Sequence, residues 1–371
     1  MEEELRAQAA MLTVARESRG LTQGEVAAAM ADAAGNAGTA VSQGYVSKAE
    51  AGRLHVTGER LQLYAAALGY PPELLCLDPQ VHGVGVGLIH HRKRASLPVS
   101  AVRRIHAQIA LTRIQLDGLV TATRGVPPAS CFPHVELSDL TTPKDAARLL
   151  RTEWGLPEGP VPDLVRAAEE AGAWIVLRDL ESDLLDAVSQ RTGQNAPLFL
   201  LNDRAPGDRC RFSVAHEIGH IVLHTQPGAS SEQEKQADAF AAEFLMPAKD
   251  IRGDFSGTVT ISKLADLKRK WRVSMAALLR RAQALSAVTE WQYRNIMVEM
   301  STLGYRTAEP VDLDLERPCR ISRLLNNLRK EYGFTDQQAA EHSYLLREEF
   351  VRLYRDGIDP LALNTSSKVR P

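Results

Sequence analysis

The chain has 371 residues, of which 44% are hydrophobic and 24% charged, and its formal net charge is −2. This length provides for two or three hydrophobic cores, and this hydrophobic content excludes a chain that is disordered throughout. No apolar run reaches the roughly 18 residues that span a bilayer, and the acidic N-terminus lacks a secretory signal pattern, so we expect a cytoplasmic protein without a membrane partner.

The first segment, residues 1–80, has the pattern of short helices joined by tight turns. Leu12–Gly20 predicts a helix that ends at a glycine-marked turn. Thr22, with Glu25 three residues later, forms a capping box that starts the next helix. Ser42 caps a third, short helix, and a further amphipathic helix carries Leu61, Tyr64, Ala65 and Leu68. This succession predicts an all-α helix-turn-helix domain.

The segments LTQGEVA and VSQGYVSKAEAG closely resemble the helix-turn-helix domain of Xre/Cro-type repressors. The resemblance implies that the helix beginning near Ser42 enters the major groove of double-stranded operator DNA. Gln43 is the best candidate for reading a base edge, because its amide both donates and accepts hydrogen bonds. Contacts to phosphates or neighbouring bases are expected from Gln23, Ser42, Tyr45, Ser47 and Lys48.

Two features of this segment depart from the family's pattern. The link of residues 31–40, between the second and third helices, is longer than the usual turn, and it either displaces the recognition helix or forms a surface loop. Residues 1–78 carry six Lys or Arg against ten Asp or Glu, a net of −4, which opposes binding to phosphates. A protein-binding role for this fold therefore stays open.

Residues 81–135 are expected to form a basic linker and a helix. Within residues 79–124 the single acid is Asp117, and the seven basic residues are Arg92, Lys93, Arg94, Arg103, Arg104, Arg113 and Arg124. Gly83–Gly87 indicates a hinge, and Ser100–Val120 has the apolar spacing of a helix. These charges either contact phosphates beside the recognition domain or lie on a solvated helix that packs against the acidic N-terminal domain.

Residues 136–305 predict a small α+β domain. Thr142 and Pro143 open an apolar-periodic helix, a second helix ends at Gly172, and Trp174–Leu177 has the pattern of a strand. Leu198–Leu201 is another apolar run. It is either an edge strand, able to pair with an extended peptide backbone, or a core strand only.

The most informative motif is HEIGH, at His216, Glu217 and His220. Residues one helical turn apart share a face, so both imidazoles can reach one tetrahedral Zn²⁺, while Glu217 can take a proton from water. The structural alternative is an ordinary helix with two satisfied histidines. His224 lies about 12 Å along the helix from His216 and cannot join the same first shell, so we expect it to interact with the helix end or line the site.

A third ligand is available in the amphipathic segment 232–246. Glu234 is our choice, because Asp238 then lies one turn later, where its carboxylate can accept the second N–H of a ligand histidine. Glu232 and Glu243 are weaker candidates, and Glu234 as an ordinary solvated charge is the alternative. The four cysteines (Cys76, Cys131, Cys210 and Cys319) form no CxxC pair, which argues against a thiolate zinc site and a disulfide framework.

HEIGH with a trailing LH, followed by EKQADAFAAEFLMP, resembles the ImmA/IrrE-type metallopeptidases. The resemblance implies a zincin-like endopeptidase that cleaves helix-turn-helix repressors, with His216, His220 and Glu234 as ligands and Glu217 as general base. HHRKRASLP followed by a helix is also similar to the connector of Xre-fused members of that family. The helical pair Ile261–Trp271 and Ser274–Ala282 is then a structural flank of the peptidase, with a second helix-turn-helix as the alternative.

The fold class predicted from these segments is multidomain and mainly α: a helix-turn-helix domain, an α+β zincin-like domain with a small sheet, and a C-terminal helical region at 306–371. The C-terminal apolar faces are expected to dock on the catalytic domain or to form a homodimer. The leading hypothesis is a DNA-binding regulator whose zinc peptidase cleaves a repressor or partner. The alternatives are a regulator whose zincin-like domain senses a metal or ligand, and a protein-interaction module.

Overall fold

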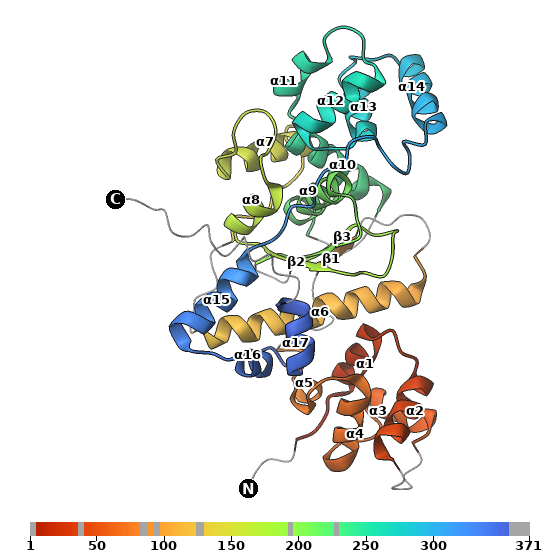
Figure 1. Ribbon diagram of the computed structural model, residues 1–371, viewed down its shortest axis with the longest axis vertical. Coiled ribbons are helices and arrows are strands. Elements are labelled where there is room, and N and C mark those ends of the chain that lie inside the picture. The colour runs from red at the N-terminus through yellow and green to blue at the C-terminus, as the bar shows by residue number, and fades with distance from the viewer. Residues whose placement is uncertain are drawn as a thin grey trace. The chain divides into compact units, whose positions relative to one another are not determined.

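The computed structural model describes residues 5–35, 41–81, 88–91, 97–123, 130–191, 196–225 and 230–355 (Figure 1). The chain forms two compact units. Unit 1 comprises Met1–Gly87, Ala95–Pro127 and Cys319–Pro371, and unit 2 comprises Leu88–Arg94 and Pro128–Pro318. Among the described residues, no helix is both long and apolar enough to cross a membrane. The expected fold class is confirmed: the chain is mainly helical, with one small sheet.

Unit 1 begins with the helices α1 (Ala9–Ser18), α2 (Gln23–Ala34), α3 (Gln43–Glu50), α4 (Gly58–Leu68) and α5 (Pro72–Cys76). The capping box of Thr22 and Glu25 is present at the start of α2, and the Ser42 hydroxyl accepts from the Tyr45 amide at the start of α3. Apolar side chains from these helices, such as Met11, Val46 and Tyr64, are fully buried. The residues 36–40 of the long α2–α3 link lie outside the described residues.

The basic segment contributes α6 (Val99–Ala122), which packs against α1. Eleven of the 24 residues of this helix are buried, and Arg113 among them is only 4% exposed. The expected packing on the N-terminal helices is present, and the expected solvated charge is found at Arg103 but not at Arg113. Arg92, Lys93, Arg94 and Arg124, and the Gly83–Gly87 hinge, lie outside the described residues.

The C-terminal helices α15 (Arg320–Tyr332), α16 (Asp336–His342) and α17 (Arg347–Tyr354) complete unit 1. Both α15 and α16 contact α6, and a side chain at Gly118 would meet the backbone oxygen of His342 at 1.9 Å. The Arg19 guanidinium donates to Glu349 at 2.8 Å. The apolar faces of these helices were expected to dock on the catalytic domain or to form a homodimer. Much of each face is buried, and the helices belong to unit 1 rather than to unit 2.

Unit 2 contains a four-stranded sheet in the order β1-β3-β4-β2, formed by Leu88–His91, Ala187–Arg191, Leu198–Asn202 and Trp174–Arg178 respectively. Strands β2 and β4 are parallel, whereas β3 is antiparallel to both β4 and β1. Strand β4 is fully buried and paired on both sides. Of the two interpretations of this strand, the structure therefore favours the core strand, and β1 and β2 are the edges.

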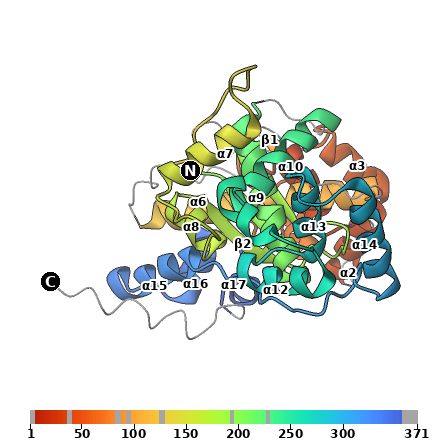
Figure 2. The ribbon, with the colours of Figure 1, turned by 90° about the horizontal axis from the view of Figure 1, so that it is seen from above.

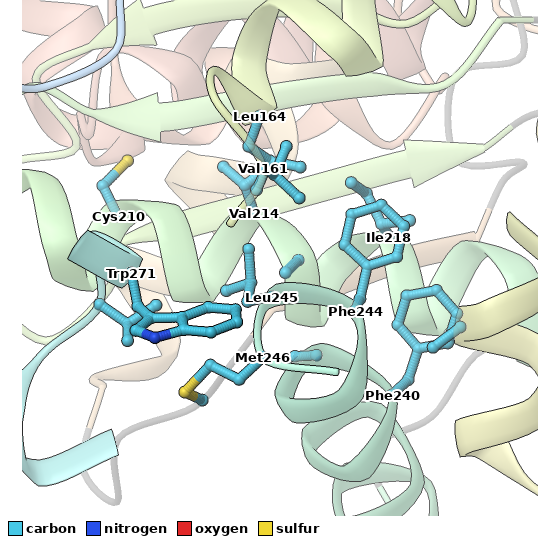
Figure 3. Close-up of a cluster of buried hydrophobic side chains, with 14 of the residues drawn as sticks. Val161, Leu164, Cys210, Val214, Ile218, Phe240, Phe244, Leu245, Met246 and Trp271 are labelled. Carbon is cyan, nitrogen blue, oxygen red and sulfur yellow. The ribbon is translucent and has the colours of Figure 1, made fainter. Parts of the chain in front are cut away.

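Helices α8 (Leu164–Glu170) and α9 (Gly207–Leu223) contact strands of this sheet, and α7 (Pro143–Glu153) and α10 (Ser231–Leu245) pack against α9 (Figures 1 and 2). The capping box of Thr142 and Asp145 starts α7, with Pro143 in its first turn. Figure 3 shows the core, in which Val214 and Ile218 of α9 meet Phe240 and Phe244 of α10. Trp271 of α12 packs in the same cluster.

The helices α11 (Ala248–Ile251), η1 (Arg252–Phe255), α12 (Ile261–Trp271), α13 (Met275–Ala284) and α14 (Glu290–Thr302) follow. The Ser274 hydroxyl caps α13, and both α12 and α13 contribute to the core of unit 2. They therefore form a flank of this unit, as expected. The segment after α14 returns to α9, where a Cβ at Gly207 would lie 2.4 Å from the Leu313 carbonyl oxygen.

Candidate metal centre and nucleic-acid interface

Helix α9 holds His216, Glu217 and His220 in a rigid, dry environment. Every residue from Val214 to Leu223 is buried, and the three polar side chains are at most 1% exposed. Their spacing of one turn places both imidazoles on the same side of the helix, with ring centroids 4.7 Å apart. Buried polar groups of this kind require partners, because desolvation penalises each one that is left unsatisfied.

Helix α10 approaches α9 closely because Gly219 lies at their contact. A Cβ at this position would lie 3.1 Å from Phe240 Cδ1 and 3.2 Å from Ala237 Cα, tighter than ordinary van der Waals contact. The stacked rings of Phe240 and Phe244 continue the contact along the helix pair. This close approach brings Glu234, in the first turn of α10, over the two histidines.

Three side chains converge on one point. His216 Nε2 and His220 Nε2 are 3.0 Å apart, and the Glu234 carboxylate lies 3.4 Å from the first and 3.2 Å from the second. A tetrahedral zinc ion with ligand distances of about 2.0–2.1 Å separates its ligand atoms by roughly 3.3–3.4 Å. The distances between the three ligand atoms are therefore close to those that a tetrahedral zinc ion requires. The ligand set that the family resemblance implies thus fits the geometry of these side chains.

The outer contacts of His216 orient its ring. His216 Nδ1 donates to Asp238 Oδ1 at 2.9 Å, as expected from the sequence, so the ring's other nitrogen carries the lone pair. Burial lowers the pKa of His216, but the hydrogen bonds to Asp238 and Glu234 outweigh it and raise this pKa to about 9. The surrounding carboxylates thus favour positive charge at this position. When no metal is bound, a proton on His216 Nε2 carries that charge, and a bound cation would replace this proton and use the lone pair.

His220 contacts His224 on the side of its ring away from His216, and His224 in turn contacts Gln236. Gln236 Oε1 lies 2.9 Å from His224 Nε2, so this nitrogen donates, and His224 Nδ1 is left as an acceptor 3.0 Å from His220 Nδ1. Burial is the main cause that lowers the pKa of His224, which favours its neutral form. His220 then donates from Nδ1, and its Nε2 lone pair faces that of His216. A cation bound to the lone pairs of both Nε2 atoms would offset the repulsion between them.

Glu217 is positioned by a strand rather than by its own helix. The Ser189 hydroxyl on β3 donates to Glu217 Oε2 at 2.6 Å. Within the described part of the chain, Glu217 Oε1 has no hydrogen-bond partner although it is buried. A buried carboxylate oxygen without a partner is suited to accept a proton or hydrogen bond from a bound molecule.

The two alternative ligands lie elsewhere. Glu243 is 1% exposed and pairs with Arg281, while Arg148 donates to its Oε1 at 2.9 Å. Burial raises the pKa of Glu243, but these guanidinium groups outweigh it and hold the pKa below its usual value. The Glu232 side chain is 68% exposed, 3.9 Å from Lys235. Cys210 is a buried thiol whose pKa burial raises to about 12, as expected for a structural cysteine.

The candidate DNA-binding face lies on α3 and its cap. Ser42, Gln43 and Lys48 are exposed, whereas Tyr45 and Ser47 are half-buried. The Ser42 oxygen accepts from an amide of α3, so its hydroxyl hydrogen stays available for a phosphate. Lys48 presents a positive charge on the same helix.

Gln23 and Gln43 are held in a connected network. Gln43 Nε2 donates to Gln23 Oε1 at 2.8 Å, and Gln23 Nε2 donates to Glu50 at 3.0 Å. Glu50 in turn accepts two hydrogen bonds from Arg16 of α1. This hydrogen-bond network orients the exposed Gln43 amide and uses one of its N–H groups, so its second N–H and its carbonyl oxygen are the groups that could meet a base.

Sequence reasoning did not assign Ser189 or Gln236, and it placed His224 at the helix end or lining the site without identifying its contact with His220. Ser189 lies 28 residues before Glu217 on a separate strand, so no periodicity connects them. His224 follows His220 at one-turn spacing, which is a signal that was present. The network of Arg16 and Glu50 links two helices and has no local pattern.

Two family profiles match the chain. The IrrE N-terminal-like domain matches residues 168–283, which include α9 and α10, and a helix-turn-helix family matches residues 14–75, which include α2 and α3. A comparison with curated proteins finds no match. The IrrE-like match is to a metallopeptidase family that is typically metal-dependent, and the helix-turn-helix match is to a DNA-binding domain.

Proposed function

Because the chain joins an Xre-type helix-turn-helix domain to an ImmA/IrrE-type domain, we propose that it is a DNA-binding transcriptional regulator that also hydrolyses peptide bonds with Zn²⁺. His216, His220 and Glu234 hold the metal, and Glu217 is the general base. The observation that carries this proposal is the convergence of two imidazole lone pairs and one carboxylate beside a buried carboxylate oxygen that has no partner among the described residues.

The chemistry of hydrolysis then follows from the arrangement of these side chains. Zinc held by the three ligands supplies Lewis acidity toward a water and toward the scissile carbonyl. Glu217 Oε1 accepts one proton from the attacking water, whose oxygen bonds to the carbonyl carbon. Glu217 then delivers that proton to the amide nitrogen as the C–N bond breaks. Ser189 holds the other carboxylate oxygen, so that Oε1 stays aimed at the water.

A substitution of the base tests the enzymatic part. Glu217→Gln keeps a similar shape and is expected to retain zinc while it loses roughly 10²–10⁴-fold in hydrolysis of an unfolded protein such as casein. Glu232→Gln, an exposed acid on α10, is the matched control and should retain full activity. Hydrolysis by Glu217→Gln at the wild-type rate would contradict the mechanism. Zinc binding without hydrolysis by any variant would favour a metal sensor instead.

The proposed substrate is a protein, by resemblance to family members that act on helix-turn-helix repressors. The contact between Ser189 of β3 and Glu217 supports this substrate class, because an extended main chain that paired with β3 would lie beside that carboxylate. Incubation of the zinc-loaded protein with candidate repressors, followed by mass spectrometry of the products, identifies the cleaved bond. The Glu217→Gln variant should leave the same repressors intact.

For DNA, we propose that α3 lies in the major groove and that the Gln43 carbonyl oxygen and its second N–H read one base pair. Gln23, Ser42, Tyr45, Ser47 and Lys48 contact phosphates or neighbouring bases. Sequence selection from a random duplex pool tests both parts. Gln43→Ala should relax specificity at one base position, whereas Lys48→Ala should weaken all sequences alike. Absence of any selected sequence with the wild-type protein would favour the protein-binding alternative.

A further inference from the structure

Strand β1 comes from a part of the chain that is remote from the rest of its sheet. It spans Leu88–His91, while the residues before it, up to Gly87, and those after it, from Ala95, belong to unit 1. The chain therefore enters unit 2 for one short strand and then returns. This strand also lies outside residues 168–283, which match the IrrE N-terminal-like family.

The edge covered by β1 is the one nearest the candidate centre. Strand β3 pairs with β4 on one side, and its other side is paired with β1 over four residues. Helix α9 contacts both β3 and β1. Ser189 of β3 donates to Glu217, and His90 is the residue of β1 in register with Ser189.

An extended peptide that paired with β3 would take the place of β1. Residues opposite each other in an antiparallel pair have Cα atoms about 4.5–5.5 Å apart, so such a peptide would pass directly beside Ser189, and thereby beside the general base. Main-chain pairing to a strand edge is a recurrent way to hold a peptide of variable sequence. This edge is therefore suited to a substrate backbone, but residues of the same chain already occupy it.

We propose that β1 is an intramolecular occupant of the peptide-binding edge of β3, and that an extended substrate segment binds by displacing it. Strand β1 has four residues and lies at the sheet edge, where few hydrogen bonds hold it. As part of the same chain, it competes at an effective concentration on the order of millimolar. Free peptides at micromolar concentration are thus excluded, while a segment with additional contacts displaces β1.

Displacement would also affect the connection between the units, because β1 lies between two stretches of chain that belong to the unit with the helix-turn-helix domain. Substrate binding at the sheet would release this strand from unit 2. The catalytic consequence of the proposal rests on the proposed function, but the strand exchange itself requires neither zinc nor hydrolysis.

The test uses the full chain with Ile89→Pro, which removes an amide hydrogen within β1 and disfavours a strand interior, and Ile89→Val as the matched control that keeps strand propensity. Ile89→Gly, which weakens the strand and keeps the amide, serves if the proline variant does not fold. Hydrogen–deuterium exchange is measured on β3. The alternate amides that face β1 should exchange at least about tenfold faster in Ile89→Pro than in Ile89→Val, and β2 amides should not change.

The second readout is binding of a fluorescent synthetic peptide, VGVGLIHHRKRA, which copies residues 84–95. It should bind Ile89→Pro at least about tenfold more tightly than wild type, because the tethered competitor is gone. Equal exchange of β3 in the proline and valine variants, or equal peptide affinity for Ile89→Pro and wild type, would overturn the proposal.

Casein hydrolysis separates this proposal from the proposed function. With zinc, Ile89→Pro should hydrolyse casein faster than wild type. If no variant hydrolyses casein but the peptide binds Ile89→Pro selectively, the proposed enzymatic function is wrong and the proposal that β1 occupies the edge of β3 is supported. If wild type and Ile89→Pro hydrolyse casein equally and the peptide does not bind, the proposed enzymatic function is supported and the proposal that β1 occupies the edge of β3 is wrong.

Discussion

Gly219→Ala tests whether the close approach of α9 and α10 sets the geometry of the metal site. The added Cβ would lie 3.1 Å from Phe240 Cδ1 and 3.2 Å from Ala237 Cα. The phenylalanine ring can rotate slightly, but the Cα is backbone, so α10 must move away by a few tenths of an ångström. Glu234 and Asp238 lie on the same helix and would move with it.

The expected magnitudes follow from this contact. Alanine gains up to about 1 kcal/mol over glycine in a helix interior, whereas overpacking a core costs about 1–3 kcal/mol. The apo protein should therefore lose only about 0–2 kcal/mol of unfolding free energy. Metal ligation tolerates deviations of about 0.2 Å, so the same displacement should weaken zinc binding by roughly 10–100-fold.

Zinc affinity is measured by competition with a chelating dye, and apo stability by denaturant unfolding in the presence of a strong chelator. Gly253→Ala is the matched control, because a Cβ there meets no atom within 4 Å. It should keep both the affinity and the stability of the wild type. If Gly219→Ala also binds zinc within about twofold of wild type, the contact between the helices does not position Glu234, and the reasoning fails.

Three further predictions concern the surroundings of the site and unit 1. Asp238→Ala removes the acceptor of the His216 N–H and should lower zinc affinity roughly 10–100-fold without unfolding the chain, as titrated with the same dye. Glu243→Gln should lower the free energy of unfolding at neutral pH. This loss of stability should shrink as the pH falls below the ordinary glutamate pKa of about 4.3, because Arg281 lowers the pKa of Glu243 and the ion pair stabilises the wild type only while the carboxylate is ionised. A loss of stability that does not depend on pH would contradict the ion pair. Gly118→Ala should cost at least about 1–3 kcal/mol or undock α16, because its Cβ would lie 1.9 Å from the backbone oxygen of the last residue of that helix; unchanged thermal unfolding would show that this packing is not maintained.

The local parts of the site were predictable because their signals lie within one or two helices. One-turn spacing identified His216 and His220, and the same rule placed Asp238 one turn after Glu234, where it accepts from His216. Capping residues located the starts of α2, α3 and α7, since a cap needs only a side chain and the amide three residues later. These features depend on short sequence separations.

Features that depend on pairing across the chain were not predictable. Ser189 reaches Glu217 from another strand, and β1 joins the sheet from the connector, so neither leaves a periodic signal. The apolar pattern of Leu198–Leu201 was compatible with an edge or a core strand, because periodicity does not specify the neighbours of a strand. Burial of Arg113 in α6 was likewise hidden, since a run of basic residues usually indicates a solvated face.

The most direct test of the central claim is the zinc content per chain after dialysis, measured by elemental analysis. The wild type, Glu217→Gln and Glu232→Ala should each retain about one zinc ion, whereas His216→Ala and Glu234→Ala should lose it. Folded wild-type protein that holds no zinc after exposure to it, or a Glu234→Ala variant that retains a full equivalent, would contradict the proposed metal centre.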